Sequence, residues 1–285
     1  MSSSSPPSPS SPGTSAYYVP PPSWWPVVGS VALFSLASGF LLLLEKIQVA
    51  PYVMAFGALL LVAMLFGWFG NVIRENQAGL FNGQVDTSFR WGMVWFILSE
   101  VMFFAGFFGA LFYTRTFAVP DLGSTPLLWP DFHAAWPTAG PGAKGSFTPM
   151  AAWGIPAINT LILLSSGATV TWAHWGMKLG RRGQVKAGLI LTVILGLLFL
   201  SLQAHEYLEA AFTIRTGIYG ATFYMLTGFH GLHVTLGVIM LVVITLRVFA
   251  GHFNAEHHFG FEAVSWYWHF VDVVWLLLFI FVYWL

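Results

Sequence analysis

A single carboxylate in the middle of an apolar stretch is the clearest candidate for chemistry in this sequence. Glu100 follows Phe96 and Ile97 and precedes Phe103 and Phe104. No basic residue lies within reach along the same predicted helix. Because an ionised group in hydrocarbon is costly, burial favours the neutral acid. Such a carboxyl could handle protons near a proton pathway, or it could hydrogen-bond to another helix, and both interpretations stay open.

Other polar side chains recur at spacings that place them on one face of a helix. They are His205, Glu206 and Glu209, then His230 and His233, and finally His269 and Asp272. Residues three or four apart share a helix face. A buried di-iron site would require Glu-x-x-His motifs, whereas the motif here is Glu-x-x-Glu. We therefore predict that these groups link helices, and a buried metal or haem site at the histidines is the less favoured alternative.

Arg247 lies near the end of an apolar segment, where its side chain can extend to the lipid headgroups. Trp68, Glu75, His252 and His257 are predicted on the same side of the membrane. Together these residues could form a pocket for an anionic lipid. Ordinary anchoring at the membrane interface explains Arg247 equally well.

The amino-acid composition indicates a membrane protein rather than a soluble one. Of the 285 residues, 57% are hydrophobic and 8% are charged, against about 25% charged residues in a soluble domain. The 11 basic and 11 acidic residues balance, which gives no indication of nucleic-acid binding, and there is no cysteine. Disulfides, thiolate metal sites and thiol catalysis are thereby excluded.

Seven segments are long and apolar enough to cross a membrane, which takes about 20 residues each. They cover residues 26–44, 52–70, 91–113, 153–175, 187–212, 218–249 and 263–284. We predict an all-α, polytopic membrane protein. Residues 1–23 form a Ser/Pro-rich tail that cannot bury a core and is expected to be disordered. The membrane domain then covers residues 24–285, with helices one and two at about 26–70 and helices three to seven at about 91–284.

The basic residues of the short loops predict the orientation. Seven lie in one set of alternate loops, namely Arg74, Arg90, Lys178, Arg181, Arg182, Lys186 and Arg247. Four lie in the opposite set, namely Lys46, Arg115, Lys144 and Arg215. The positive-inside rule places the N-terminus in the cytoplasm and the C-terminus outside. The longest loop, residues 114–152, then lies outside and is expected to cap the helices or to contact a partner.

Long ordered strings of residues also point to a family. They are Phe96-Ile-Leu-Ser-Glu-Val-Met-Phe-Phe-Ala-Gly-Phe-Phe108, Gln203-Ala-His-Glu-Tyr-Leu-Glu-Ala-Ala-Phe-Thr-Ile214, Thr227-Gly-Phe-His-Gly-Leu-His-Val234, His257-His-Phe-Gly-Phe-Glu-Ala263 and Trp266-Tyr-Trp-His-Phe-Val-Asp-Val-Val-Trp275. In this order they resemble helices three, five, six and seven of cytochrome c oxidase subunit III from the aa3-type haem-copper oxidases. The resemblance covers nearly the whole chain from Trp24 onward.

The resemblance implies a seven-helix fold whose first two helices are splayed from the last five by a cleft that holds phospholipids. It implies no redox cofactor in this subunit, with haem a, haem a3, CuA and CuB in partner subunits I and II. Cytochrome c would be the electron donor to the complex. The expected role is accessory: the chain supports proton uptake, lipid binding and the stability of the catalytic subunit. We expect it in the bacterial inner membrane, with a periplasmic C-terminus.

The resemblance also carries over to particular residues. Glu100 matches the intramembrane carboxylate of the family and is the candidate for a role in proton uptake. Trp68, Glu75, His233 and Arg247 match positions near the lipid cleft. The remaining polar residues named above match positions that link helices, and no catalytic or metal-binding residue is implied.

Three other interpretations differ in testable ways. A quinol-oxidising haem-copper oxidase has a related third subunit, which commonly lacks the first two helices. An independent transporter would be expected to show internal repeats and discontinuous helices, and neither is visible in the sequence. A stand-alone metalloenzyme built on the histidines would carry a stoichiometric metal.

Overall fold

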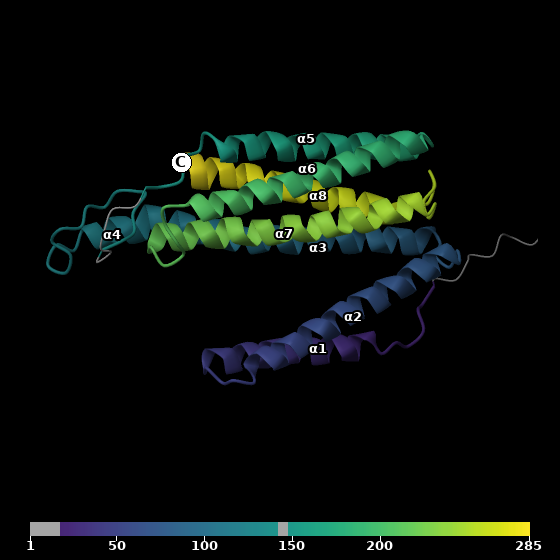
Figure 1. Cartoon of the computed structure of the whole chain (residues 1–285), viewed down its shortest axis with the longest axis horizontal. Helices are drawn as coiled ribbons and strands as arrows, with labels where there is room; N and C mark the ends of the chain where they lie inside the picture. Colours follow the sequence, from purple (N-terminus) through teal and green to yellow (C-terminus); the bar gives the residue numbers. More distant parts are fainter. Residues whose placement is uncertain (1–17, 142–147) are drawn as a thin grey trace, which may run out of the picture. The chain divides into compact units, whose positions relative to one another are not determined.

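The computed structural model describes residues 18–141 and 148–285, and every regular element in these ranges is helical (Figure 1). The elements are α1 (Trp25–Leu44), α2 (Ala50–Gln77), α3 (Gly83–Tyr113), the π-helical η1 (Thr114–Ala118), α4 (Val119–Gly123), α5 (Ile155–Lys178), α6 (Arg182–Glu209), α7 (Ile218–Phe249), α8 (Phe259–Leu278) and the π-helical η2 (Phe279–Trp284). Seven of the described helices are long and apolar enough to cross a membrane. The prediction of an all-α, seven-helix membrane protein is confirmed.

The helix boundaries follow the prediction most closely where both ends are apolar. The predicted span of residues 218–249 coincides with α7. In contrast, α6 begins at Arg182 rather than at residue 187, and α2 continues to Gln77 rather than ending at residue 70. Hydropathy marks the hydrocarbon crossing, whereas backbone hydrogen bonding continues through the polar residues at the membrane surface.

The region predicted as a loop from residue 114 to residue 152 begins instead as a helix. The helical path of α3 continues without a break through η1 and α4 to Gly123. Pro120 lies in α4, which directly follows the π-helical turn η1. The prediction that the loop starts at Thr114 is therefore wrong, because the helical backbone continues through the polar residues and the proline that follow Tyr113.

The chain divides into two compact units, Met1–Phe89 and Arg90–Leu285. In the first unit, α1 and α2 pack through small residues. The buried residues of α1 are Gly29, Ala32, Ser35 and Gly39. A Cβ on Gly57 of α2 would lie 2.9 Å from the carbonyl oxygen of Ala32. Small residues of this kind let two helices approach closely in lipid.

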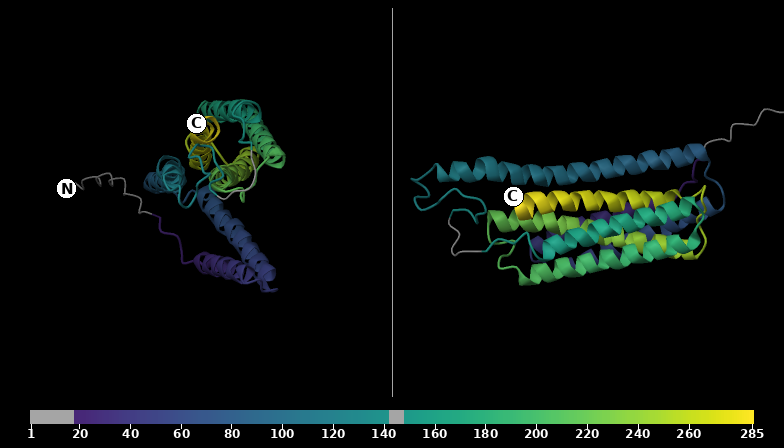
Figure 2. Two further views of the ribbon diagram at one scale, coloured as in Figure 1. Left: turned by 90° about the vertical axis from the view of Figure 1, so that its left-hand side faces the viewer. Right: turned by 90° about the horizontal axis from the view of Figure 1, so that it is seen from above.

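The second unit is a bundle in which α5, α6, α7 and α8 run roughly parallel or antiparallel to one another (Figures 1 and 2). The helix at its core is α8, whose Trp268 and Trp275 are almost fully buried. The indole of Trp268 lies against two glycines on different helices: a Cβ on Gly196 of α6 would come within 2.8 Å of it, and one on Gly237 of α7 within 2.9 Å. Large rings on α8 thus fill the space that glycines leave on its neighbours.

Hydrogen bonds from the two tryptophans tie α8 to α5. The Nε1–H of Trp268 donates to Ser166 Oγ at 2.9 Å, and the Nε1–H of Trp275 donates to Thr160 Oγ1 at 2.9 Å. A further link joins α5 to α6 through the hydroxyls of Thr169 and Thr192 at 2.8 Å. Hydrogen bonds between side chains thus join α5 to both α8 and α6.

The chain after Gly123 returns to the bundle and covers the start of α7. The backbone N–H groups of Ile218 and Tyr219 donate to the carbonyls of Ala139 and Thr138 at 3.2 and 3.1 Å. The Tyr219 hydroxyl accepts a hydrogen bond from the backbone N–H of Met150 at 3.2 Å. Of the two roles expected for this segment, capping the bundle is thus observed for its described residues. Lys144 lies outside them.

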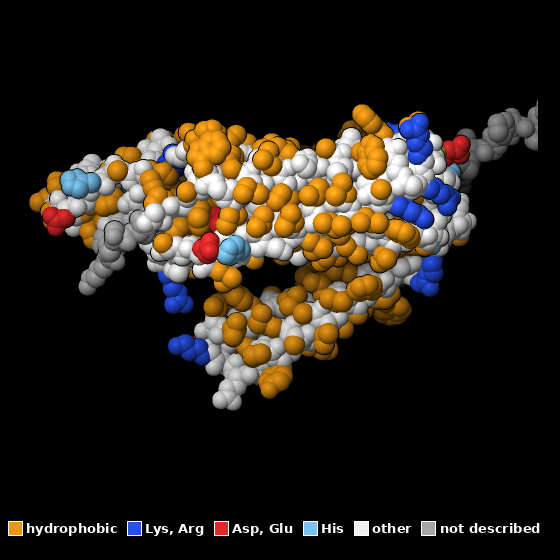
Figure 3. All heavy atoms as spheres, turned by 45° about the horizontal axis from the view of Figure 1, so that its top comes forward, with side chains coloured by type: hydrophobic (Ala, Val, Ile, Leu, Met, Phe, Trp, Pro, Cys, Tyr) orange, Lys and Arg blue, Asp and Glu red, His pale blue; other side chains and the backbone are white. Residues whose placement is uncertain are grey.

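Basic residues of the bundle are gathered at one of its ends (Figure 3). Figure 3 shows Lys and Arg side chains at one end of the bundle and hydrophobic side chains along its flank. That end holds the turn between α5 and α6, with Lys178, Arg181, Arg182 and Lys186. The predicted disordered tail lies for the most part outside the described residues. From residue 18 the chain is described, and the Tyr18 ring lies 5.8 Å from that of Phe81.

Candidate functional site

The intramembrane carboxyl of Glu100 is paired with a histidine from another helix. Its Oε2 lies 2.7 Å from Nε2 of His233, which is near the middle of α7. The two side chains are 22% and 10% exposed. The sequence placed Glu100 and His233 in separate functional groups, one for proton handling and one for lipid, whereas the structure brings them into direct contact.

The second nitrogen of the His233 ring defines where the protons of this pair lie. Nδ1 is 2.6 Å from the backbone carbonyl oxygen of Phe229. A carbonyl oxygen only accepts, so Nδ1 carries a hydrogen. Nε2 is then either the acceptor for a proton on Glu100 or itself protonated beside a carboxylate. In both cases the pair holds one shared proton and its net charge is zero.

Aromatic side chains surround the pair within the same unit. The ring centroids of Phe104 and Phe103 lie 4.9 and 5.8 Å from that of His233, and Phe270 of α8 lies 6.3 Å away. The Tyr267 hydroxyl donates to the His233 backbone carbonyl at 3.3 Å. Because a hydrogen bond is stronger in surroundings of low polarity, the hydrogen bond between Glu100 and His233 favours this particular packing of α3 against α7.

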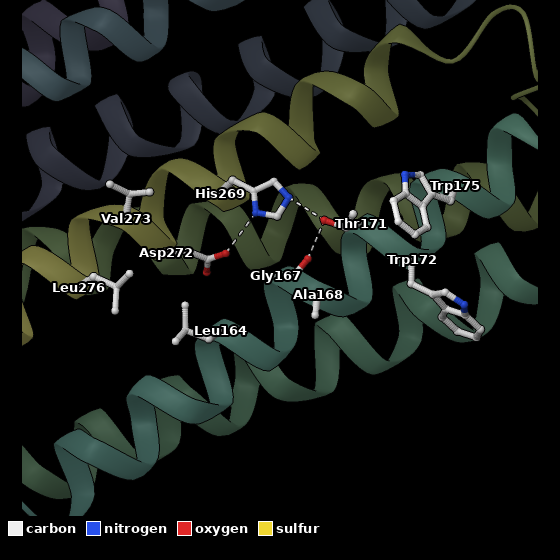
Figure 4. Close-up of a pocket in the computed structure, with 10 residues that line it drawn as sticks. All are labelled: Leu164, Gly167, Ala168, Thr171, Trp172, Trp175, His269, Asp272, Val273 and Leu276. Carbon is white, nitrogen blue, oxygen red and sulfur yellow. Dashed lines mark hydrogen bonds and ion pairs between the residues drawn. The ribbon is translucent and has the colours of Figure 1, made fainter.

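A second polar group lines a groove of about 540 Å³ between α5 and α8 (Figure 4). His269 connects the two helices: its Nε2 lies 3.0 Å from Thr171 Oγ1 and its Nδ1 lies 3.3 Å from Asp272 Oδ2. Asp272 is 6% exposed, and its Oδ1 has no hydrogen-bond partner in the described structure. Gly167 lies directly against the Asp272 carboxyl, where a Cβ would collide with Oδ2.

His230 lies in the core of the bundle and joins α7 to α8. Its Nε2–H donates to the backbone carbonyl of Val271 at 3.1 Å, and its ring lies 5.3 Å from that of Trp275. The partners of His230 and His233 are thus a carbonyl and a carboxyl on different helices. Although the two histidines are three residues apart in the sequence, they make separate links between helices.

The polar residues near the end of α6 divide by burial. His205 and Glu209 are more than half exposed and pair with each other within the helix at 3.5 Å. Glu206, between them, is 2% exposed. Its carboxyl oxygens make no hydrogen bond of regular geometry, and the nearby polar group is the Tyr283 hydroxyl. Glu206 is therefore the member of this group that belongs to the helix packing.

The residues predicted to bind lipid lie in both units. Trp68 and Glu75 are on α2, and the Trp68 side chain is exposed and stacks on Phe69. In the second unit, the Arg247 guanidinium lies 4.3 Å from the centre of the Phe253 ring, and its Nε is buried without a hydrogen-bond partner. Arg247 thus keeps a charged group at the basic end of the bundle.

One cluster was missed by the sequence analysis. His174 of α5 lies beside His258 and Glu262 at the start of α8, and one ligand atom from each lies within 4.8 Å of the others. Glu262 also forms a salt bridge with Arg90 of α3 at 2.6 Å. The signal available in the sequence was indirect: each residue lies at a helix end predicted on the same side of the membrane.

Comparison with known proteins gives a consistent result over almost the whole chain. The family model described as cytochrome c oxidase subunit III matches residues 15–285. A protein of Cyprinus carpio named cytochrome c oxidase subunit 3 is 44% identical over 264 residues, covering 91% of this chain and 93% of the relative. The protein of that name from Drosophila melanogaster is 44% identical over 261 residues, with the same coverage of both chains. The chain belongs to the cytochrome c oxidase subunit III family.

Proposed function

We propose that this chain is a non-redox accessory subunit that supports proton uptake by the catalytic subunit of a cytochrome c oxidase. The observation that carries the proposal is the pair of Glu100 and His233, a proton-binding unit inside the membrane. Because its net charge is zero with its proton in either position, it can exist at low polarity without the cost of an isolated ion.

The test is Glu100→Gln in the assembled oxidase. We expect slower proton uptake, or a smaller number of turnovers before inactivation, with unchanged haem spectra. His205→Gln is a matched control, because His205 is exposed on the bundle surface. Loss of the haem a spectrum in the assembled Glu100→Gln complex would contradict an accessory role.

We also propose that phospholipid binds near Trp68 and Glu75 of α2 and near His233 and Arg247 of α7. Support comes from the exposed aromatic face of Trp68 and from the Arg247 guanidinium at the basic end of the bundle. Lipid bound there would stabilise the subunit against dissociation. Phospholipid analysis of the purified complex tests this part.

The proposed complex receives electrons from cytochrome c, through cofactors held by subunits I and II. The names of the relatives support this donor, and the presence of α1 and α2 disfavours the five-helix form common in quinol oxidases. The competing function is subunit III of a quinol oxidase. Assays of the purified complex with reduced cytochrome c and with a quinol distinguish the two, because only the true electron donor supports oxygen reduction. Co-purification of haem a, haem a3 and copper with this chain tests the partners.

The proposed location is the bacterial inner membrane, with the N-terminus in the cytoplasm and the C-terminus in the periplasm. The excess of basic residues at the end of the bundle formed by α5 and α6 supports the orientation. A reporter fused after Leu285 is expected to be active only outside the cytoplasm, and a cytoplasmic reporter would reverse the assignment.

A further inference from the structure

Two buried histidines at the basic end of the bundle have ring nitrogens without partners. His258, directly before α8, is 9% exposed, and its Nδ1 has no hydrogen bond. Nε2 of His174, on α5, is likewise buried and without a partner. Each unsatisfied buried polar atom costs free energy, so two of them side by side require a physical reason.

The two rings are neighbours, and a carboxylate completes the group. The ring centroids of His174 and His258 lie 5.5 Å apart. Glu262, in the first turn of α8, brings a carboxylate oxygen to within 4.8 Å of a nitrogen of each ring. Three ligand atoms, one from α5 and two from the beginning of α8 and the residue before it, thus lie close together.

The types of these ligands select the kind of ion. Two imidazole nitrogens and one carboxylate oxygen form a ligand set that zinc uses with a water molecule in the fourth position. Calcium and magnesium prefer oxygen ligands throughout. We propose that His174, His258 and Glu262 bind a zinc ion and that this ion joins α5 to α8.

The neighbouring cations determine how tightly such an ion is held. Arg90 Nη1 lies 2.6 Å from Glu262 Oε2, so the guanidinium and the metal compete for one carboxylate. Lys178 is one helical turn beyond His174 on the same helix. Both positive charges oppose a divalent cation, and zinc binding is therefore reversible and sensitive to Arg90.

Occupation of the site would affect the contact between α3 and α8. Arg90 lies ten residues before Glu100 on α3, about 15 Å along the helix. When zinc occupies Glu262, the salt bridge between Arg90 and Glu262 weakens, and α3 loses one of its connections to α8. This inference stands independently of the proposed role in proton uptake, because binding is measured without turnover.

The experiment measures zinc in the purified oxidase complex after chelator treatment and equilibrium dialysis against zinc. The parent complex is expected to retain one zinc ion more per complex than His174→Gln or His258→Gln. The matched control is His257→Gln, because His257 is the exposed neighbour of His258 and lies outside the cluster. Equal zinc content in the parent and in both cluster variants would overturn the proposal.

A second variant gives an effect of the opposite sign. Arg90→Gln removes the competing cation and is expected to tighten zinc binding, whereas a merely destabilising substitution would weaken it. Weaker or unchanged zinc binding in this variant contradicts the competition for Glu262. Should the histidine variants fail to assemble, anomalous diffraction at the zinc edge from zinc-soaked crystals of the parent complex decides the matter. A peak between the three side chains supports the site, and an empty position refutes it.

Discussion

Glu100 Oε2 and His233 Nε2 lie 2.7 Å apart on different helices, while the other ring nitrogen of His233 is bound to the Phe229 carbonyl. The histidine is therefore held in one orientation by its own helix and presents a single nitrogen to the carboxyl. A buried acid can hold two helices together through a hydrogen bond, and it can also carry a proton. In this arrangement the two roles can be tested separately, because different substitutions of Glu100 remove the hydrogen bond or only the ionisable proton.

We expect Glu100→Gln to keep the contact and Glu100→Leu to lose it. The glutamine amide can donate to His233 Nε2, so the stability of the complex should change little. Leucine leaves the buried imidazole nitrogen without a partner, which costs about 1–3 kcal/mol. Thermal unfolding of the two complexes checks this difference, and equal stability of the two variants would show that the contact does not hold α3.

Double substitution tests whether the two residues act as one unit. If proton uptake depends on the pair, Glu100→Gln combined with His233→Gln should be no slower than the more severe single variant. Residues in contact are expected to couple by about 0.5–3 kcal/mol. Proton-uptake rates of the four proteins give the coupling, and fully additive effects would indicate two separate functions.

Gly167→Ala should loosen the packing of α5 on α8. The added methyl group would collide with the Asp272 carboxyl, and overpacking of this kind costs about 1–3 kcal/mol. Gly228→Ala on α7 is the matched control, since a Cβ there meets nothing within 4 Å. A lower midpoint of thermal unfolding is expected for Gly167→Ala alone.

Glu206 and Glu209 should respond differently to the same substitution. Glu206→Gln removes an ionisable group from a buried position beside the Tyr283 hydroxyl. A gain in stability on the order of 1 kcal/mol is expected, because the amide has no charge to desolvate. Glu209→Gln lies on the exposed surface and should stay within about 0.5 kcal/mol of the parent. Unfolding measurements of both variants make the comparison.

Arg247→Gln should reduce the phospholipid that purifies with the complex. The guanidinium is the charged group at this position that could bind an anionic headgroup, whereas glutamine offers only neutral hydrogen bonds. Arg181→Gln, at the same end of the bundle but exposed, is expected to leave the lipid content unchanged. Mass spectrometry of extracted lipid measures both, and equal loss in the two variants would indicate general interfacial attraction.

The number of helices and most of their extents could be predicted, because crossing hydrocarbon requires long apolar runs. The continuation of α3 beyond Tyr113 could not, because Thr114, Arg115 and Pro120 are typical of a helix end while backbone geometry continues through them. Glu100 was recognised as exceptional from its neighbours alone.

The partner of Glu100 could not be predicted from the sequence, because the contact joins residues that are 133 positions apart. The same holds for the cluster of His174, His258 and Glu262, whose members meet only because the end of α5 lies beside the start of α8. Pairings within one helix, such as that of His205 and Glu209, follow from spacing. Pairings between helices depend on which faces pack together, and composition does not determine that.

The position of Trp268 against Gly196 and Gly237 has a consequence for how this sequence can vary. One indole occupies volume that three helices supply jointly, so no single one of the three residues can change size alone. A methyl group added to either glycine must be matched by a smaller ring on α8, and a smaller ring alone leaves a void beside both glycines. The sizes of the side chains at these three positions therefore depend on one another. In related sequences, a substitution at one position is expected to be accompanied by a compensating substitution at another.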